Sequence, residues 1–384
     1  MAERPLRVAF LNASLDIGGS ERQMVTLAER LPRDRFQPEF VLLKRRGPLA
    51  ERAAAADVPI HVVGWGARDS GIRQVGDAAR LVGRLRRGRY DIVDAWLFHA
   101  YALAGLTRRL TRVPVLIAGR RSLADYKRGF GRAERLLDRL TRAAPDGIVA
   151  NAEAVRIEAA SFEGLDPAQI RVIHNGIDVA APIDPGARAA IRAGWGFGDD
   201  AVVFGAVANY KPGKGLPALI RTMARLIPDV PAARLVVVGE GRLRADLERL
   251  VSELGLERAV CLSGPSPDAR AVVPAFDVAV QASESEGLPN AVLEAAAAGV
   301  PIVATDAGGT REILDGGAAG VLVPVRDEPA LAAGMRRLAA EPSLRRVLGE
   351  RGQAFVGATF GIDRFVRETA SLYEELAERK GVRR

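Results

Sequence analysis

The chain has 384 residues, of which 48% are hydrophobic and 27% are charged. These proportions are typical of a globular protein and exclude a disordered or fibrous chain, while the length favours two domains or one large α/β domain. The formal net charge is +8, and the single cysteine, Cys261, excludes an internal disulfide and a cysteine-ligated zinc site.

The amino terminus, Met1 to Arg7, contains acid and proline and leads directly into a short apolar run. It lacks the long apolar segment and the cleavage site of a secretory signal. No stretch reaches the roughly eighteen uninterrupted apolar residues that a membrane-spanning helix needs. We therefore expect a cytoplasmic protein that does not cross a membrane.

Short β-rich runs alternate with longer amphipathic segments, which is the pattern of parallel sheets covered by helices. In the first half, strands are expected at 8–11, 40–43, 60–63, 92–95, 115–118 and 147–150. A second series is expected at 202–207, 235–238, 259–262, 278–281, 301–304 and 320–323. Cys261 is expected to be a buried hydrophobe of one of these strands.

Turn-forming residues at 181–186 predict the hinge between two doubly wound domains. We expect an N-terminal domain over 1–180 and a C-terminal domain over 181–360. The remaining segment, 361–384, carries a helix near 363–378 with no strand after it.

Basic residues are concentrated between Gly71 and Arg142, where 17 Lys and Arg stand against 6 Asp and Glu. Two groups stand out: Arg80, Arg84, Arg86, Arg87 and Arg89, and then Lys127, Arg128, Arg132, Arg135, Arg139 and Arg142 at helical spacings. Region 71–142 is either a solvated face or a surface for anionic lipid headgroups or an anionic acceptor. No nucleic-acid motif is present, so nucleic acid is not expected as a partner.

Glycine loops follow expected strands in both domains, after 8–11 and after 235–238, at the sheet edge where ligands of open α/β folds bind. Gly18 and Gly19 would let backbone amides approach a phosphate, although a plain β-to-α turn explains them equally well. Gly239 and Gly241 are interpreted as a tight turn at the edge of the cleft. They are not a dinucleotide fingerprint, because Arg244 occupies the sixth position.

Only five lysines occur in the chain, and two of them, Lys211 and Lys214, lie in the loop Asn209 to Gly215. An ammonium close to a helix start suits a phosphate oxygen, and the alternative is a solvated turn. The loop is not a P-loop, because no Ser or Thr follows Gly213-Lys214-Gly215 to hold magnesium.

The most informative segment is Ser283 to Glu294. Pro289 is predicted to be the first residue of a helix from about Leu288 to Ala298. The free amides of Gly287, Leu288 and Asn290 would then point at an anion. A carboxylate buried among the alanines of that helix, Glu294, would need a partner such as a ribose diol.

His99, just beyond the strand 92–95, is a candidate cleft residue, whereas His61 and His174 are interpreted as structural. The chain has no metal-ligand spacing and no Ser-His-Asp order. Cationic side chains and helix amides are therefore expected in place of a metal.

These motifs together resemble a known family. They are Gly18-Gly19, Asn175-Gly176-Ile177-Asp178, Lys211 to Gly215, Gly239-Glu240-Gly241, Glu286 with Glu294, and Thr305 to Glu312. The chain is similar to the retaining, metal-independent glycosyltransferases of family four. That resemblance implies the GT-B fold, with two Rossmann-like doubly wound parallel-sheet domains facing a deep cleft, and no cofactor.

The resemblance further implies that a nucleotide diphosphate-sugar lies on the C-terminal domain. Lys214 and the amides from Gly287 to Asn290 would then hold the diphosphate, Glu294 the ribose and Glu286 the transferred sugar. Gly19 and His99 would approach from the first domain, Gly239 would border the nucleoside, and the last helix would cross back to the first domain. The acceptor would be a hydroxyl of a sugar, a lipid-linked molecule or an anionic glycan.

One departure from the family is Asn209, which stands where an arginine is common, and Lys211 is the candidate substitute. Two alternative functions follow from the same scaffold. One is a nucleotide-sugar epimerase, and the other is a catalytically silent sugar-nucleotide-binding protein.

Overall fold

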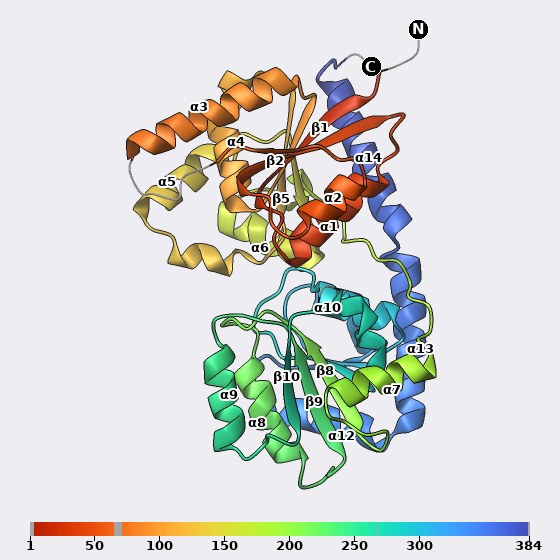
Figure 1. The fold of residues 1–384 in the computed structure, drawn as a ribbon. Coiled ribbons are helices and arrows are strands. Elements are labelled where there is room, and N and C mark those ends of the chain that lie inside the picture. Colours follow the sequence, from red (N-terminus) through yellow and green to blue (C-terminus); the bar gives the residue numbers. More distant parts are fainter. Residues whose placement is uncertain (1–3, 65–70, 267, 383–384) are drawn as a thin grey trace. The chain divides into compact units, whose positions relative to one another are not determined.

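The computed structural model describes residues 4–64, 71–266 and 268–382, and the chain divides into two compact units (Figure 1). The first comprises Met1–Gly176 and Ile362–Arg384, and the second comprises Ile177–Gly361. The divisions lie a few residues from positions 180 and 360. The expectation about a secretory signal rests partly on residues 1–3, which lie outside the described residues.

The first unit contains a parallel seven-stranded sheet in the order β3-β2-β1-β4-β5-β6-β7. Its strands are β1 (Leu6–Ser14), β2 (Phe36–Arg45), β3 (Ile60–Val62), β4 (Ile92–Trp96), β5 (Val115–Arg120), β6 (Gly147–Ala150) and β7 (Ile170–Val172). Its α-helices are α1 (Gly19–Arg30), α2 (Ala50–Ala55), α3 (Gly71–Gly88), α4 (Phe98–Thr111), α5 (Arg132–Thr141), α6 (Glu153–Glu163) and α14 (Ile362–Arg379). The 3-10 helices are η1 (Ala124–Gly129) and η2 (Pro167–Gln169).

The second unit contains a parallel six-stranded sheet in the order β10-β9-β8-β11-β12-β13. Its strands are β8 (Val202–Val207), β9 (Ala233–Val238), β10 (Val260–Gly264), β11 (Val278–Gln281), β12 (Ile302–Thr305) and β13 (Val321–Val323). Its α-helices are α7 (Pro185–Gly194), α8 (Leu216–Leu226), α9 (Arg244–Glu253), α10 (Asn290–Ala297), α11 (Thr310–Ile313), α12 (Glu328–Ala340) and α13 (Pro342–Thr359). The 3-10 helices are η3 (Ala269–Ala271), η4 (Val273–Ala275) and η5 (Asp315–Gly317).

Each sheet reverses its strand order once, between β1 and β4 in the first unit and between β8 and β11 in the second. All twelve predicted strands are present, and β7 is the additional one. The expectation of two doubly wound parallel-sheet domains is therefore confirmed. The turn-rich segment expected as a hinge contains the start of α7, where the Asp184 carboxylate accepts the Ala187 amide at 3.0 Å.

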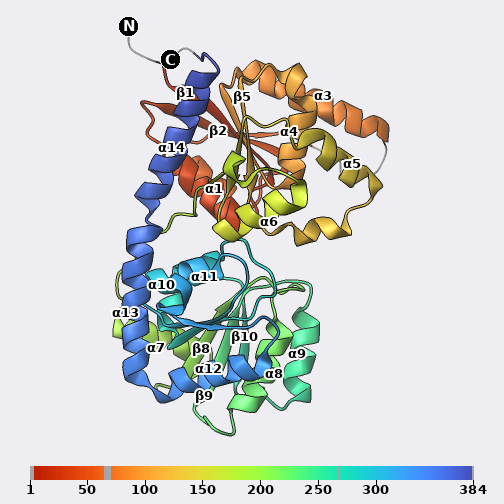
Figure 2. The same cartoon turned by 180° about the vertical axis from the view of Figure 1, so that it is seen from behind.

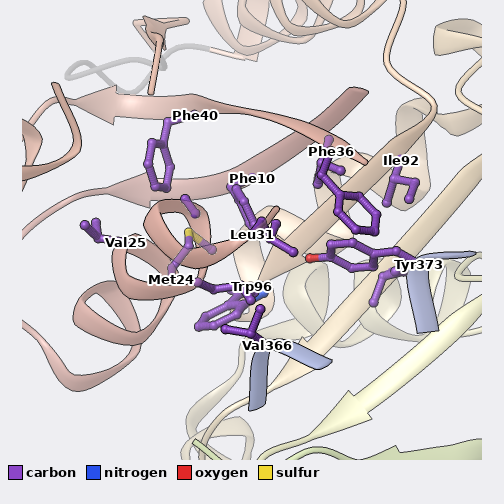
Figure 3. Close-up of a cluster of buried hydrophobic side chains, with 14 of the residues drawn as sticks. Phe10, Met24, Val25, Leu31, Phe36, Phe40, Ile92, Trp96, Val366 and Tyr373 are labelled. Atoms are coloured by element: carbon purple, nitrogen blue, oxygen red, sulfur yellow. The ribbon is translucent and has the colours of Figure 1, made fainter. Parts of the chain in front are cut away.

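Apolar helix faces cover both sides of the first sheet. Buried side chains of α1, α2 and α14 share one cluster with the sheet, and those of α3 and α4 share another on the opposite face (Figures 1 and 2). Figure 3 shows Phe36, Trp96 and Tyr373 within the first cluster, so α14 completes this core from the far end of the chain. In the second unit, α8 and α12 contribute Leu219, Met335 and other side chains to a further core.

Part of the basic region 71–142 is not a solvated surface. Lys127 is buried on η1, where its Nζ lies 2.8 Å from both Asp138 and Glu163. Arg120, also buried, pairs with Glu163 at 2.8 Å. The expectation that Lys127 belongs to an exposed basic helix face was therefore wrong, because it precedes α5 and turns inward to two carboxylates.

Other members of that region are also paired. Arg80 binds Asp77 and two backbone carbonyls, Arg84 lies 3.0 Å from Glu39, and Arg142 donates to the backbone oxygen of Glu163 at 2.5 Å. In contrast, Arg128, Arg132, Arg135 and Arg139 are exposed. The side chains of 71–75 and of 125–126, which belong to the same region, are outside the described residues.

No helix in the described ranges combines the length and apolarity needed to cross a bilayer. Cys261 lies in the strand expected at 259–262, but that strand, β10, is at the edge of the sheet, so the residue is half-buried where the sequence predicts a buried one. Partial burial raises the pKa of its thiol.

Candidate active site

Four loops of the second unit lie at the carboxyl edge of its sheet, around the reversal between β8 and β11. They follow β8 (208–215), β9 (239–243), β11 (282–289) and β12 (306–309). The edge where parallel strand order reverses is the usual ligand site of an open α/β sheet. Most of the candidate residues from the sequence lie on these four loops.

Backbone hydrogen bonds connect the loops to each other. The Glu284 amide donates to Gly213 at 2.8 Å, which joins the loops after β11 and β8. The Gly309 amide donates to Gly287 at 2.7 Å, which joins the loops after β12 and β11. The four loops therefore have defined positions relative to one another within this unit.

Close backbone approaches explain two of the glycines. Gly215 has φ +66°, and a Cβ there would lie 1.8 Å from the Ala282 oxygen. Gly308 has φ +54°, and a Cβ there would lie 1.8 Å from the Glu286 oxygen. Side chains are excluded at both positions by the neighbouring loop, so these glycines set the spacing around Glu286.

Lys214 and Glu286 form an ion pair between the loops after β8 and β11, with Nζ and Oε1 2.5 Å apart. The exposed fractions of the two side chains are 21% and 13%. A pair so shielded from water is stronger than a surface pair, and the ammonium remains accessible to a competing anion. The structure thus brings together two residues that the sequence singles out separately.

The other polar candidates on the loop after β8 are more open to solvent. Asn209 and Lys211 are exposed, and the Lys211 amide donates to the Asn209 oxygen at 2.8 Å. Gly239 and Gly241 pack against the backbone of Ala208 and Tyr210, so the loop after β9 lies directly beside them. The Lys211 side chain is therefore exposed on a loop whose backbone packs against its neighbour.

Helix α10 begins one residue later than the sequence predicts. Pro289 caps it with φ −72° and ψ 110°, so Pro289 is not the first helical residue and α10 spans Asn290–Ala297. The correction follows from the extended ψ of Pro289, whose carbonyl accepts the amides of Val292 and Leu293 at 3.1 and 3.2 Å. Within the described residues, the amides of Gly287 and Leu288 make no hydrogen bond, which leaves these two donors for a ligand.

Glu294 lies on α10 and is half-buried, so it is less enclosed than the sequence predicts. Arg270, on η3, is part of its electrostatic surroundings. Burial acts to lower the pKa of Arg270, but the hydrogen bond to Asp268 and the charges of Asp268 and Glu294 raise it overall. Glu294 therefore has a cationic neighbour that sequence reasoning missed, because the two residues are far apart in the chain.

Tyr210 is a second residue that sequence reasoning missed. It is buried beneath the loop after β8, and its hydroxyl donates to the Val237 oxygen at 2.7 Å. Burial is the main cause that raises its pKa to about 12. Its position directly before Lys211 was the only available signal.

The candidates on the first unit occupy the equivalent edge of the first sheet. Gly18 is the N-cap of α1 after β1, Gly19 begins that helix, and His99 is exposed in the first turn of α4 after β4. Partial loss of hydration and then the charge of Lys44 lower the pKa of His99. Leu97, which precedes α4, has φ +67° and ψ 161°, a strained backbone conformation that is normally reserved for glycine.

Within the described residues, no three His, Cys, Asp or Glu side chains gather into a potential metal site. Among the described residues, the polar groups nearest the reversal point include the Lys214 ammonium, the carboxylates of Glu286 and Glu294, and the amides of Gly287 and Leu288. Such a set can bind an anion and a diol together.

The fold and this edge define the chain as a two-domain α/β protein of the GT-B type. Two family models match it: "Glycosyl transferases group 1" over residues 187–355 and "Glycosyltransferase Family 4" over residues 17–181. A D-inositol 3-phosphate glycosyltransferase of Geodermatophilus obscurus is 31% identical over 76% of this chain and 68% of its own length. The chain belongs to the family-four glycosyltransferases.

Two further comparisons extend over most of the chain. The lipopolysaccharide core biosynthesis glycosyltransferase LpsE of Rhizobium meliloti is 28% identical over 87% of this chain and 89% of its own length. The crystal structure of Anabaena Alr3699/HepE in complex with UDP and glucose has a TM-score of 0.86 and 21% identity, and covers 96% of this chain and 100% of HepE. Alignments with three other relatives span 50%, 68% and 60% of those proteins' lengths.

Proposed function

We propose that this glycosyltransferase transfers a sugar from a nucleotide diphosphate-sugar to a hydroxyl acceptor, with retention of anomeric configuration and without a metal ion. The observation that carries the proposal is the ion pair between Lys214 and Glu286, fixed at the carboxyl edge of the second sheet. It places a cation for phosphate beside a carboxylate for a sugar hydroxyl.

Chemical complementarity supports the following position for the donor. Its diphosphate lies against Lys214 and the unpaired amides of Gly287 and Leu288, followed by Asn290 at the start of α10. Glu294 accepts hydrogen bonds from the ribose hydroxyls, and Glu286 accepts one from the transferred sugar. The nucleoside borders the loop that contains Gly239 and Gly241.

The ion pair changes its role when the donor binds. Without a bound donor, the Glu286 carboxylate neutralises the Lys214 ammonium, with Oε1 and Nζ 2.5 Å apart. A diphosphate oxygen competes for the same ammonium, and the carboxylate then becomes available to a sugar hydroxyl. This exchange avoids leaving either charge unpaired in a shielded position.

Catalysis follows from the charge that develops as the glycosidic bond lengthens. Negative charge grows on the leaving diphosphate, where Lys214 and the loop amides stabilise it. The acceptor hydroxyl attacks from the face that the diphosphate leaves, and a leaving-group oxygen takes its proton.

The complex of HepE with UDP and glucose supports a sugar nucleotide as the donor, since HepE shares the fold. At 21% identity that likeness concerns the fold alone. The sugar, the base and the acceptor, whether a lipid-linked molecule, a glycan or a small sugar, are matters for direct assay.

The test begins with a thermal-shift panel of UDP, GDP, ADP and their sugars, without metal and with EDTA. Incubation with the stabilising donor and candidate acceptors follows, and the anomeric configuration of the product is assigned. Transfer with retention in EDTA is expected. Inversion would contradict the mechanism, a change of the donor alone would indicate an epimerase, and binding without turnover would indicate a silent binding protein.

A further inference from the structure

Two neighbouring helices of the first unit expose leucines that no core requires. On α4, Leu106 and Leu110 are 56% and 57% exposed, and on α5, Leu136 and Leu140 are 58% and 66% exposed. Ten large hydrophobic side chains are exposed in the described part of the chain, and four of them lie on this pair of helices. Such a concentration marks a binding surface more strongly than scattered exposed leucines do.

The two helices pack against each other. The ring of Phe98, at the start of α4, lies 4.5 Å from that of Phe130, two residues before α5. A Cβ on Gly105, in the middle of α4, would lie 3.0 Å from the Cβ of Thr141, at the end of α5. The two leucines of each helix are four residues apart, so each pair forms a short apolar stripe on its own helix.

Arginines surround these stripes. Six are exposed on α4, α5 and their adjoining residues: Arg109, Arg112, Arg128, Arg132, Arg135 and Arg139. Within residues 4–64, 71–266 and 268–382 none of the six forms an ion pair with a carboxylate. We call the four leucines and six arginines the leucine–arginine face.

The acidic residues of α5 are used elsewhere. Asp138 is buried and pairs with Lys127 at 2.8 Å, and the Glu134 carboxylate accepts the backbone amide of Gly131 at 2.8 Å. The helix therefore keeps its carboxylates for the interior and for its own N-terminus. Its outer side retains arginine charge together with leucine.

We propose that the leucine–arginine face docks onto a bilayer that contains anionic lipids. Arginine guanidinium groups would bind headgroup phosphates, while the leucines enter the boundary between headgroups and acyl chains. A second copy of the chain is a poorer occupant, because pairing this face with itself would oppose arginine with arginine. Nucleic acid is also disfavoured, because a phosphate backbone offers nothing for the four leucines.

The test uses sedimentation of the full-length protein with vesicles, either of phosphatidylcholine alone or with about 30 mol% phosphatidylglycerol. Binding is expected only to the anionic vesicles, and it should weaken when salt rises from about 0.1 M to about 0.5 M. Arg135→Gln with Arg139→Gln should lower the partition coefficient about fivefold per charge. Leu136→Gln with Leu140→Gln should lower it at least about tenfold.

Matched controls carry the same chemical changes on the second unit. Arg258→Gln with Arg351→Gln removes two exposed charges there, and Leu254→Gln replaces a leucine that is 38% exposed. Both controls should bind like the unaltered protein. All variants should keep their sugar-nucleotide thermal shift, which separates this proposal from the donor site.

Three outcomes would overturn the proposal. The first is no binding to anionic vesicles, and the second is equal loss in the face variants and the controls. The third is a dimer in size-exclusion chromatography that Leu136→Gln with Leu140→Gln dissolves, without vesicle binding by the unaltered protein. In that case the face joins two copies of the chain.

Discussion

Two shielded charge clusters, one in each unit, differ in how much they leave open to a ligand. In the first unit, Glu163 is 1% exposed and holds both Arg120 and Lys127, so carboxylate and cations close on each other. In the second unit, the Lys214 and Glu286 side chains are 21% and 13% exposed, and the nearby amides of Gly287 and Leu288 make no hydrogen bond within the part of the chain that the structure describes. The comparison indicates that the first cluster maintains the fold and that the second can exchange partners.

The largest expected effect is on the closed cluster. Glu163→Gln leaves Arg120 and Lys127 buried with less negative charge nearby, and should lower the free energy of unfolding by about 3–5 kcal/mol. Chemical denaturation followed by circular dichroism measures this change. The control is Glu375→Gln, whose exposed pair with Arg171 should be worth no more than about 1 kcal/mol. Equal losses of unfolding free energy in Glu163→Gln and Glu375→Gln would show that the buried cluster contributes no more to stability than an exposed ion pair.

The open cluster should respond in activity more than in stability. Lys214→Ala removes the cation that faces the leaving diphosphate, and kcat/KM should fall roughly a hundred- to thousandfold. Steady-state transfer assays measure this, with circular dichroism to confirm folding. Lys211→Ala, on the same loop but exposed, should weaken donor binding by about tenfold or less. Similar mild losses from both lysines would contradict the assignment.

The spacing around Glu286 depends on the backbone of Gly308. Gly308→Ala should lower the free energy of unfolding by about 2–3 kcal/mol and weaken donor binding, because the new Cβ meets the Glu286 oxygen at 1.8 Å. Gly316→Ala is the matched control, since its φ is +66° and nothing lies within 4 Å of the added Cβ. Only backbone strain of about 1–2 kcal/mol should then appear. Titration calorimetry measures donor binding by both variants. Equal affinities would contradict the role given to Gly308 in spacing the loop around Glu286.

The smallest expected effect is the pH dependence of the closed cluster. Burial acts to raise the pKa of Glu163, but Arg120 and Lys127 hold it below its ordinary 4.5. A lowered carboxylate pKa stabilises the fold above about pH 4.5, and this contribution is lost as pH falls through the folded-state value. The free energy of unfolding, measured by denaturation at a series of pH values, should therefore fall more steeply with decreasing pH in the unaltered protein than in Glu163→Gln. If the free energies of unfolding of the two proteins fell in parallel with pH, Glu163 would not be the source of this pH dependence.

The sequence predicted the sheets well because their strands are short apolar runs between turn formers. It missed β7, whose three residues, Ile170–Val172, include the exposed Arg171 and lie at the edge of the sheet. Lys127 was misplaced because its spacing from Arg132 and Arg135 was counted as one helix. The structure instead ends η1 at Gly129 and begins α5 at Arg132.

Individual site residues could be singled out from the sequence, but their contact could not. Lys214 and Glu286 are 72 residues apart and meet only because β8 and β11 are neighbours in the sheet. The half-burial of Glu294 and its proximity to Arg270 likewise depend on how α10 and η3 pack. The basic region 71–142 of the first unit was harder to interpret from the sequence. The sequence does not reveal which of its arginines are neutralised by carboxylates in the fold.

Helix α14 has a consequence for how the chain matures on the ribosome. Its Phe365 and Tyr373 belong to the same buried cluster as Phe36, yet the whole of Ile177–Gly361 is synthesised between them. The second unit is one continuous segment and can fold before α14 is made. At that stage the first unit still has an apolar groove where α14 will pack. That groove is closed only after α14 has been synthesised, so the nascent first unit is the part that most needs chaperone protection.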